Sequence, residues 1–299
     1  FTFLRGAAAV MASDLAAGAR TDLRVELCGD AHLGNFRWYY APNREQVFDL
    51  NDFDETLPGP FEWDVKRLAA SVTVSARANG CSGSQARAAT RSAMRYYRTF
   101  IAEASELSPL DLHYYRVKSQ AALERIEKHG KTHRKWKEEV LAKATRNNSL
   151  RAFDKLTDVV DGRRVIVPDP PLIVRADDMI AANESDAVGK FLDRYRQSLP
   201  LDRRTLLDRF SLVDIAKKVV GVGSVGTRCL IVLLAAGDGT PLFLQFKQAV
   251  PSVLEAHLGA SAFEQAGQRV VEGQRLIQAT SDVLLGWARW QEPGAEDID

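Results

Sequence analysis

The sequence is poor in cysteine, and its cysteines match neither a disulfide framework nor a zinc site. Of 299 residues only three are cysteines, and Cys28, Cys81 and Cys229 lie far apart. An odd number of widely spaced cysteines favours a reducing compartment. We therefore expect a cytoplasmic protein whose cysteines carry no metal.

Long apolar runs and an excess of either charge are also missing. The longest apolar run, residues 229–236, has eight residues, whereas a membrane-spanning helix needs about 20. The 40 basic residues balance 39 acidic ones, so the charge gives no reason to expect a nucleic-acid partner. Residues 116–151 are locally basic, with 11 Lys and Arg against 4 Asp and Glu. Within them we interpret residues 128–137 as a solvated helical face, with a surface for nucleic acid or an acidic substrate as the alternative.

What remains is an ordinary globular composition, with 45% hydrophobic and 26% charged residues. The patterns predict three segments: a mixed α/β segment at 1–105, a helical basic segment at 106–210, and an antiparallel sheet with one long helix at 211–299. Asp64 is expected to cap a helix whose buried face includes Val65, Leu68 and Val72. The other expected elements are helices at 3–18, 84–105, 184–210 and 263–281, strands at 23–28, 47–50, 213–220, 227–234 and 242–248, and a hairpin joining 156–160 to 164–167.

A glycine-rich motif lies within the third segment. Gly221, Gly223 and Gly226, with Ser224 between them, follow the pattern G-x-G-x-x-G. A dinucleotide-binding loop runs into a helix, but here the glycines run into the expected strand 227–234. We therefore expect a hairpin of the kind that kinases fold over phosphates, with a glycine-rich hairpin that binds nothing as the alternative.

A lysine follows this motif on the next strand. Alternation places Lys247 on one face with Phe243 and Gln245. A lysine at this position can hold the phosphates of a nucleotide if a carboxylate orients it. Glu272 on the following helix is the chosen partner, Glu255 and Glu264 are alternatives, and an edge-strand surface lysine is the competing interpretation.

Acidic residues gather after the two N-terminal strands. Asp30 and Asn35 lie in a short loop after the first strand, and the second strand runs into four acids within seven residues, Asp49, Asp52, Asp54 and Glu55. Such a cluster predicts a divalent cation, held by Asn35 and Asp52 with Asp54 as a helper. Asp30 is then left as a base. The competing interpretation of residues 29–32 is a turn capped by His32.

Two of these elements resemble a known enzyme class. Residues 29–35 resemble the G-D-x-H-x-x-N catalytic loop of aminoglycoside and choline kinase-like phosphotransferases, and residues 52–64 resemble their metal-binding segment. The glycine motif and Lys247 resemble the N-lobe of the same superfamily but come last in the chain. The resemblance therefore implies an α+β, protein-kinase-like, two-lobed fold that is circularly permuted and truncated at its C-terminus.

The permuted order is similar to the bacterial domain of unknown function 2252. Residues 3–6, 51–56, 221–226 and 269–275 follow the style of that family. Arg228 and Gln245 depart from the kinase pattern at adenine-pocket positions, so the nucleotide and the activity stay open.

The resemblance implies a Mg²⁺-dependent transfer of the γ-phosphoryl group of ATP to an unidentified hydroxyl. A nucleotide-binding pseudokinase and a nucleotidyl transferase are alternatives, and a dinucleotide oxidoreductase ranks last. The implied roles are catalysis by Asp30, His32, Lys247 and Glu272, nucleotide binding by Gly221, Gly223, Ser224, Gly226 and Lys247, and metal binding by Asn35, Asp52 and Asp54.

Overall fold

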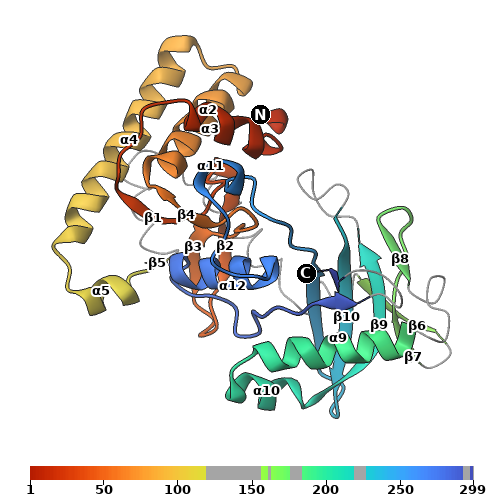
Figure 1. The fold of residues 1–299 in the computed structure, drawn as a ribbon. Helices are drawn as coiled ribbons and strands as arrows, with labels where there is room; N and C mark the ends of the chain where they lie inside the picture. Colours follow the sequence, from red (N-terminus) through yellow and green to blue (C-terminus); the bar gives the residue numbers. More distant parts are fainter. Residues whose placement is uncertain (119–155, 161–162, 176–183, 219–226, 292–296, 299) are drawn as a thin grey trace. The chain divides into compact units, whose positions relative to one another are not determined.

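A computed structural model describes residues 1–118, 156–160, 163–175, 184–218, 227–291 and 297–298 (Figure 1). The chain forms two compact units. The first comprises Phe1–Glu124 and Pro251–Asp282, and the second comprises Arg125–Val250 and Val283–Asp299. Both contain helices and strands, so the α+β class is confirmed. In the part of the chain that the structure describes, no helix has the length and apolarity to cross a membrane.

The first unit contains two small antiparallel sheets and a set of helices. One sheet pairs β1 with β4, and the other has the order β2-β3-β5. Helix α4 begins at a capping box, in which Ser82 and Gln85 exchange side-chain to backbone hydrogen bonds. The elements are α1 (Thr2–Arg5), α2 (Ala8–Ala16), β1 (Arg24–Leu27), the 3₁₀ turn η1 (Leu33–Asn35), β2 (Phe36–Tyr40), β3 (Gln46–Leu50), β4 (Leu57–Pro60), α3 (Glu62–Ala78), α4 (Gly83–Ser105), α5 (Pro109–Tyr114), β5 (Val117–Lys118), α11 (Glu255–Leu258) and α12 (Ala266–Ile277).

Strand β4 was not expected, because it contains Pro58, Gly59 and Pro60. Its partner β1 runs antiparallel to it, with Leu27 opposite Leu57 and Arg24 opposite Pro60. Proline is tolerated in a strand when it lies at a sheet edge, where its missing N–H is not needed. In a pair of strands each strand is an edge, so the prolines do not prevent pairing.

Helix α3 corrects two expectations. It begins at Glu62 after Phe61, so Asp64 lies in its first turn and is not its N-cap. Its buried residues are Trp63, Arg67 and Ser71, so the most buried face is partly polar instead of the predicted apolar face of Val65, Leu68 and Val72.

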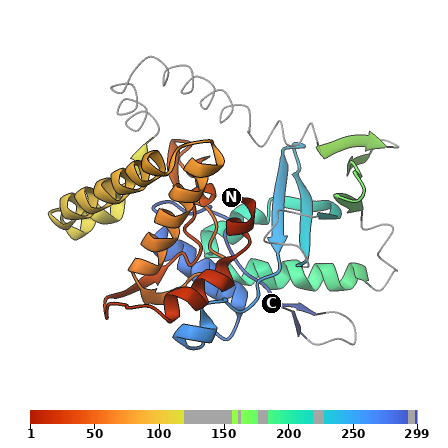
Figure 2. The ribbon, with the colours of Figure 1, turned by 90° about the horizontal axis from the view of Figure 1, so that it is seen from above.

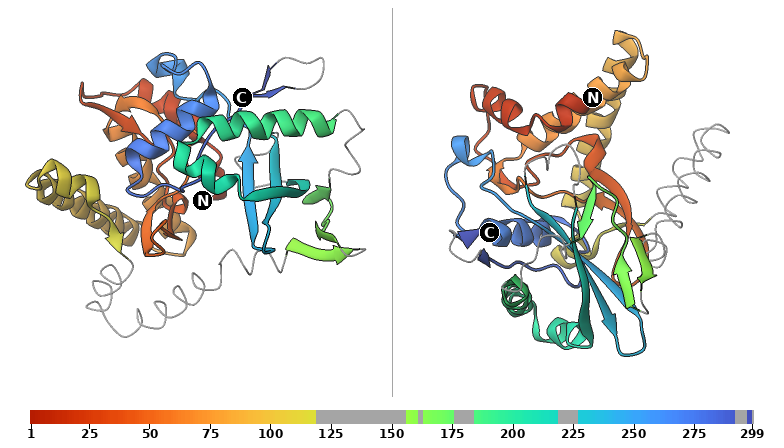
Figure 3. Two further views of the ribbon diagram at one scale, coloured as in Figure 1. Left: turned by 90° about the horizontal axis from the view of Figure 1, so that it is seen from below. Right: turned by 90° about the vertical axis from the view of Figure 1, so that its right-hand side faces the viewer.

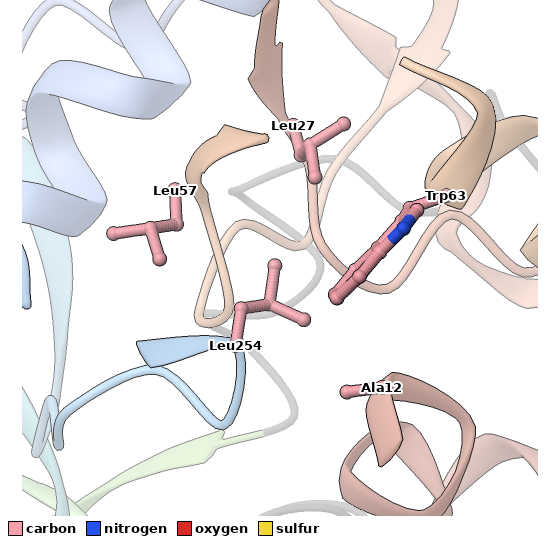
Figure 4. Packing of buried hydrophobic residues seen from close by; sticks show 5 residues of the cluster. All are labelled: Ala12, Leu27, Leu57, Trp63 and Leu254. Carbon is pink, nitrogen blue, oxygen red and sulfur yellow. The ribbon is translucent and has the colours of Figure 1, made fainter. Parts of the chain in front are cut away.

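A hydrophobic cluster joins distant segments of the first unit. Figure 4 shows Trp63 of α3, Leu27 of β1 and Leu254 turned toward one another, with Leu57 and Ala12 beside them. All five are at most 3% exposed. The cluster thus links the β1–β4 pair to the N-terminal helices and to the segment before α11.

Helix α12 belongs to this unit as well. Its Val270 and Ile277 pack against a buried cluster of Cys28, Ala31 and Phe53. In Figures 1 and 2, α12 (blue) lies beside the orange N-terminal strands. The prediction had grouped this helix with the preceding sheet, but its apolar side chains pack on N-terminal loops instead.

The second unit is built on an antiparallel sheet of order β11-β10-β9-β8. Ile231, Leu233 and Phe243 pack with Ile166 of β7 on one face. Val232, Leu234 and several β11 residues pack with α9 on the other face. Figure 3 (right) shows the ribbon of α9 beside the sheet. This alternation confirms the predicted strands. The elements are β6 (Thr157–Val160), β7 (Arg163–Ile166), β8 (Ile173–Arg175), α9 (Glu184–Ser198), α10 (Leu201–Leu207), β9 (Phe210–Lys218), β10 (Cys229–Ala236), β11 (Pro241–Lys247), β12 (Trp290–Gln291) and β13 (Asp297–Ile298).

Candidate active site

The loop that carries Asp30 starts where β1 ends. Gly29 has φ +83°, and a Cβ at this position would lie 2.2 Å from the carbonyl oxygen of Glu55. Only glycine avoids both the left-handed backbone strain and this overlap. The tight turn therefore presses the Asp30 loop against the loop that follows β3.

The carboxylate of Asp64 holds this turn from helix α3. It accepts hydrogen bonds from the backbone N–H of Cys28 at 2.7 Å and of Gly29 at 3.0 Å. Burial raises the pKa of Asp64 to about 6, although these two bonds oppose the rise. Asp64 thus caps a loop 35 residues away in sequence, and its negative charge also suits the N-terminus of its own helix.

Arg67, one turn further along α3, binds Asp30. Its Nε and Nη2 each lie 2.7 Å from Oδ1 of Asp30. The Asp30 side chain is 18% exposed and that of Arg67 is 3% exposed. Burial raises the pKa of Asp30 to about 7, because the lowering by Arg67 is outweighed and the charges of Asp52 and Glu55 add to the rise. A neutral-range pKa suits a group that exchanges protons.

His32 and Asn35 shape the rest of the loop. The Gly34 N–H donates to Nδ1 of His32 at 3.0 Å, and Nε2 of His32 lies 3.7 Å from Oδ2 of Asp30. Burial lowers the pKa of His32 to about 4, with further lowering by Arg67 and Arg5, so the ring is neutral at pH 7. Asn35 donates from Nδ2 to the carbonyl oxygen of Asp30 at 2.8 Å.

The loop after β3 lies directly beside the Asp30 loop. The Cys28 thiol donates to the carbonyl oxygen of Asp52 at 3.2 Å, and the Asn51 N–H donates to that of Asn35 at 3.0 Å. Asp52 is close enough for its charge to raise the pKa of Asp30. The structure therefore brings together the predicted residues Asp30, Asn35 and Asp52.

Two of the four clustered acids are bound by backbone amides. Asp49 accepts from the N–H of Leu50 and of Ala279 at 2.8 and 3.0 Å, and Glu55 accepts from that of Val253 at 2.7 Å. Among the described residues no hydrogen bond reaches the Asp52 carboxylate, and no group of three His, Cys, Asp or Glu forms a metal site. A cation bound at this loop would therefore need an amide oxygen or non-protein ligands in addition to Asp52 and Asp54.

Arg269 of α12 binds the loop that follows β3. It is 2% exposed and donates to the carbonyl oxygens of Thr56 at 2.6 Å and Asp54 at 2.8 Å. Gln278, the C-cap of the same helix, donates to the carbonyl oxygen of Leu50 at 2.7 Å. This role was not predicted, and the charged Arg269 directly before Val270 and Val271 is a signal that could have found it.

Comparison with known proteins places this arrangement in a family. Residues 1–296 match the family described as "Uncharacterized protein conserved in bacteria (DUF2252)". The chain belongs to the DUF2252 family. No curated protein and no solved structure matches it.

The predicted nucleotide-binding residues of this DUF2252 chain lie in its second unit. Gly221, Gly223, Ser224 and Gly226 fall outside the described residues. The strands on either side, β9 and β10, pair antiparallel with Leu230 opposite Lys217. The described strands before and after the glycine segment are thus antiparallel neighbours in one sheet, and the predicted hairpin tip itself lies outside the described residues.

Lys247 and Glu272 belong to different units. Lys247 ends the edge strand β11, opposite Cys229, and its side chain is exposed. Glu272 lies on α12 and forms an ion pair with Arg275 at 2.9 Å. The predicted pairing of Lys247 with Glu272 stays a prediction.

Proposed function

We propose that this DUF2252 chain is a Mg²⁺-dependent phosphotransferase that moves the γ-phosphoryl group of ATP to the hydroxyl group of an acceptor. The observation that carries the proposal is the juxtaposition of two loops, one holding Asp30 on Arg67 and one holding Asp52. Phosphoryl transfer needs mainly positioning and charge neutralisation. A candidate base beside a candidate magnesium ligand offers both.

The polar groups of these loops fit a magnesium ion. Asn35 uses Nδ2 to bind the carbonyl oxygen of Asp30, which leaves its Oδ1 as a possible ligand. Asp52 offers a carboxylate that accepts no hydrogen bond from the described residues, and Asp54 is exposed. Magnesium commonly takes one or two carboxylates and completes its shell with water and phosphate, and when bound it neutralises phosphate charge.

Asp30 has the role of base in this proposal. It accepts the proton of the acceptor hydroxyl while the hydroxyl oxygen bonds to the γ-phosphorus, and the bond from that phosphorus to the β-phosphate oxygen breaks to release ADP. His32 supports the Asp30 loop through its bond from Gly34. The neutral-range pKa of Asp30 is suited to this exchange.

We extend the proposal to a protein-kinase-like, circularly permuted fold. Lys247 and the residues 221–226 then bind the triphosphate, and Glu272 orients Lys247. The antiparallel pairing of β9 with β10 around the glycine segment supports this assignment, because dinucleotide-binding loops join a strand to a helix.

The decisive experiment measures nucleotide binding by calorimetry with and without Mg²⁺. We expect Mg²⁺-dependent ATP binding in the parent and its loss in Asp52→Asn, which removes a carboxylate from the cation site. Asp22→Asn is the matched control, because Asp22 is an exposed aspartate of the same unit. Equal binding by Asp52→Asn and the parent would contradict the metal assignment.

Labelled ATP then separates transfer from its alternatives. Release or transfer of a γ-label supports phosphotransfer, whereas transfer of an α-label supports nucleotidyl transfer, and binding without either supports a pseudokinase. For a phosphotransferase, Asp30→Ala should lower turnover by about 10²–10⁴-fold and leave ATP affinity within a factor of about two of the parent.

A further inference from the structure

Three side chains on one face of helix α3 bind the Asp30 loop. Asp64 accepts from the amides of Cys28 and Gly29, and Ser71 accepts from the N–H of Leu33 at 3.0 Å. Arg67 lies between them and binds the Asp30 side chain itself. Positions 64, 67 and 71 follow the i, i+3, i+7 spacing of one helix face, so α3 fixes the loop at its start, its centre and its end.

Arg67 treats the two oxygens of Asp30 differently. Both Nε and Nη2 bind Oδ1 at 2.7 Å. Oδ2 has His32 Nε2 at 3.7 Å, which is too long for a hydrogen bond. The arginine therefore occupies one oxygen and sets the rotation of the carboxylate, and Oδ2 is the oxygen that Arg67 leaves open.

The N-terminal segment in turn fixes Arg67. Nη2 also donates to the carbonyl oxygen of Leu4 at 2.6 Å, and Nη1 lies 3.5 Å from Sδ of Met11. With the Arg67 side chain only 3% exposed, the guanidinium is held on both sides. The planar guanidinium presents its N–H donors in a fixed arrangement, so one arginine binds the carboxylate and the backbone carbonyl in a defined orientation, whereas a lysine ammonium is a compact point charge with rotatable donors.

Stability alone gives a poor reason for this arrangement. A buried ion pair is often no more stabilising than well-packed apolar residues, because desolvation offsets the attraction between the charges. We propose that Arg67 is a positioning residue that turns Asp30 so that Oδ2, and not Oδ1, receives the proton of the acceptor hydroxyl. This inference rests on the proposed phosphotransfer and adds the residue that orients its base.

The test uses the full chain with Mg²⁺-ATP and water as the acceptor. Steady-state hydrolysis is compared in the parent, Arg67→Met, Arg67→Lys and Arg77→Met, the last being an exposed arginine of the same helix. We expect kcat to fall about 10²-fold in Arg67→Met, because a misplacement of about 1 Å can cost that much. KM for ATP should stay within a factor of about two, Arg67→Lys should recover part of kcat because it keeps one donor to Oδ1, and Arg77→Met should match the parent.

Failure of the inference and failure of the proposed function give different results in this test. A folded, active parent with an equally active Arg67→Met variant overturns the positioning role and leaves the phosphotransfer standing. The inference is also overturned if kcat and KM change together and Arg67→Lys recovers nothing, because that pattern is a general structural loss. A parent without turnover refutes the proposed function, and the role of Arg67 in proton transfer falls with it.

A spectroscopic readout tests the contact independently of turnover. The ¹⁵N–¹H signal of Arg67 Nε should move in Asp30→Asn, where the ionic partner becomes an amide, and should stay in place in Asp22→Asn. An unmoved signal in Asp30→Asn would show that Arg67 does not hold the Asp30 carboxylate, and this would overturn the inference whatever the kinetics.

Discussion

Arg269 should contribute far more to stability than an arginine two turns away on the same helix. Arg269 is 2% exposed and donates to two backbone carbonyls, of Thr56 at 2.6 Å and of Asp54 at 2.8 Å. Arg269→Met leaves the buried Thr56 carbonyl without this donor and removes the hydrogen bond to the Asp54 carbonyl. An unsatisfied buried polar group costs about 1–3 kcal/mol. The two losses should therefore lower the free energy of unfolding by about 3 kcal/mol, once the gain from burying methionine is included.

Arg275→Met is the matched control for this prediction. Arg275 is 31% exposed and pairs with Glu272, which is 30% exposed and three residues earlier. Exposed helical ion pairs of this kind contribute about 0.2–0.5 kcal/mol. The same substitution on the same helix should therefore cost about 2–3 kcal/mol less than at Arg269.

Urea unfolding of the full chain measures the difference, and hydrogen exchange locates it. Arg269→Met should speed amide exchange in residues 49–56, because its two carbonyl partners lie in that loop, and Arg275→Met should not. Equal unfolding free energies for the two variants, or unchanged exchange in residues 49–56, would show that Arg269 does not brace the loop.

Two further predictions concern the Asp30 loop. His32 has a pKa lowered to about 4, so its stabilising effect is complete above about pH 6.5. As the pH falls toward 4, the free energy of unfolding should decrease by up to about 3 kcal/mol, because the unfolded chain binds the proton more readily. In His32→Asn the free energy of unfolding should depend less on pH in this range, and parallel pH profiles of variant and parent would contradict the prediction. Gly29 and Gly80 share a positive φ, +83° and +82°, but only Gly29 has a close neighbour, the Glu55 carbonyl. Gly80→Ala should cost about 1 kcal/mol and Gly29→Ala clearly more by urea unfolding, and equal costs would refute the close approach.

The sequence predicted the second unit well because its signals are local. Alternation of apolar residues placed β10 and β11 correctly, and the turn at Gly237–Thr240 is present, with Gly239 at φ +83°. The predicted hairpin is present as β6 paired with β7, with its turn residues Asp161 and Gly162 outside the described part. Two-residue periodicity and turn glycines involve residues that are close together in the chain, so both can be recognised in a single sequence.

The first unit was harder to predict because its determining contacts span the chain. Asp64 precedes a helical pattern and therefore resembles an N-cap, but its carboxylate binds amides that lie 35 and 36 residues earlier. Helix α12 follows the sheet of the second unit in sequence, yet its Arg269 binds residues more than 200 positions away. No residue near Asp64 or Arg269 in the sequence indicates these distant partners. Both predictions assumed that neighbours in the chain are neighbours in the fold, and both were therefore wrong.

The acidic residues after β3 are stabilised in part by backbone amides, which the prediction of a cation did not take into account. Repulsion among Asp49, Asp52, Asp54 and Glu55 predicted a cation, but backbone amides already stabilise Asp49 and Glu55. A folded chain can offset clustered negative charge with N–H dipoles from distant segments as well as with a metal. The residues that we propose for a cation are therefore Asp52 and Asp54 together with Asn35.

Helix α3 carries the signal that could have found Arg67. The polar residues Asp64, Arg67 and Ser71 share one face with Trp63, which is 2% exposed, so a charged side chain stands on the side of the helix that packs inward. A buried polar group is more informative than an exposed apolar one, because it has to be paired at a cost in desolvation. Asp30, the proposed base, lies in the loop before this helix. An arginine that faces inward from the helix is then expected to bind its carboxylate and hold it in one orientation. The helical period and the position of Trp63 are therefore enough to connect the pattern in α3 with the chemistry proposed for Asp30.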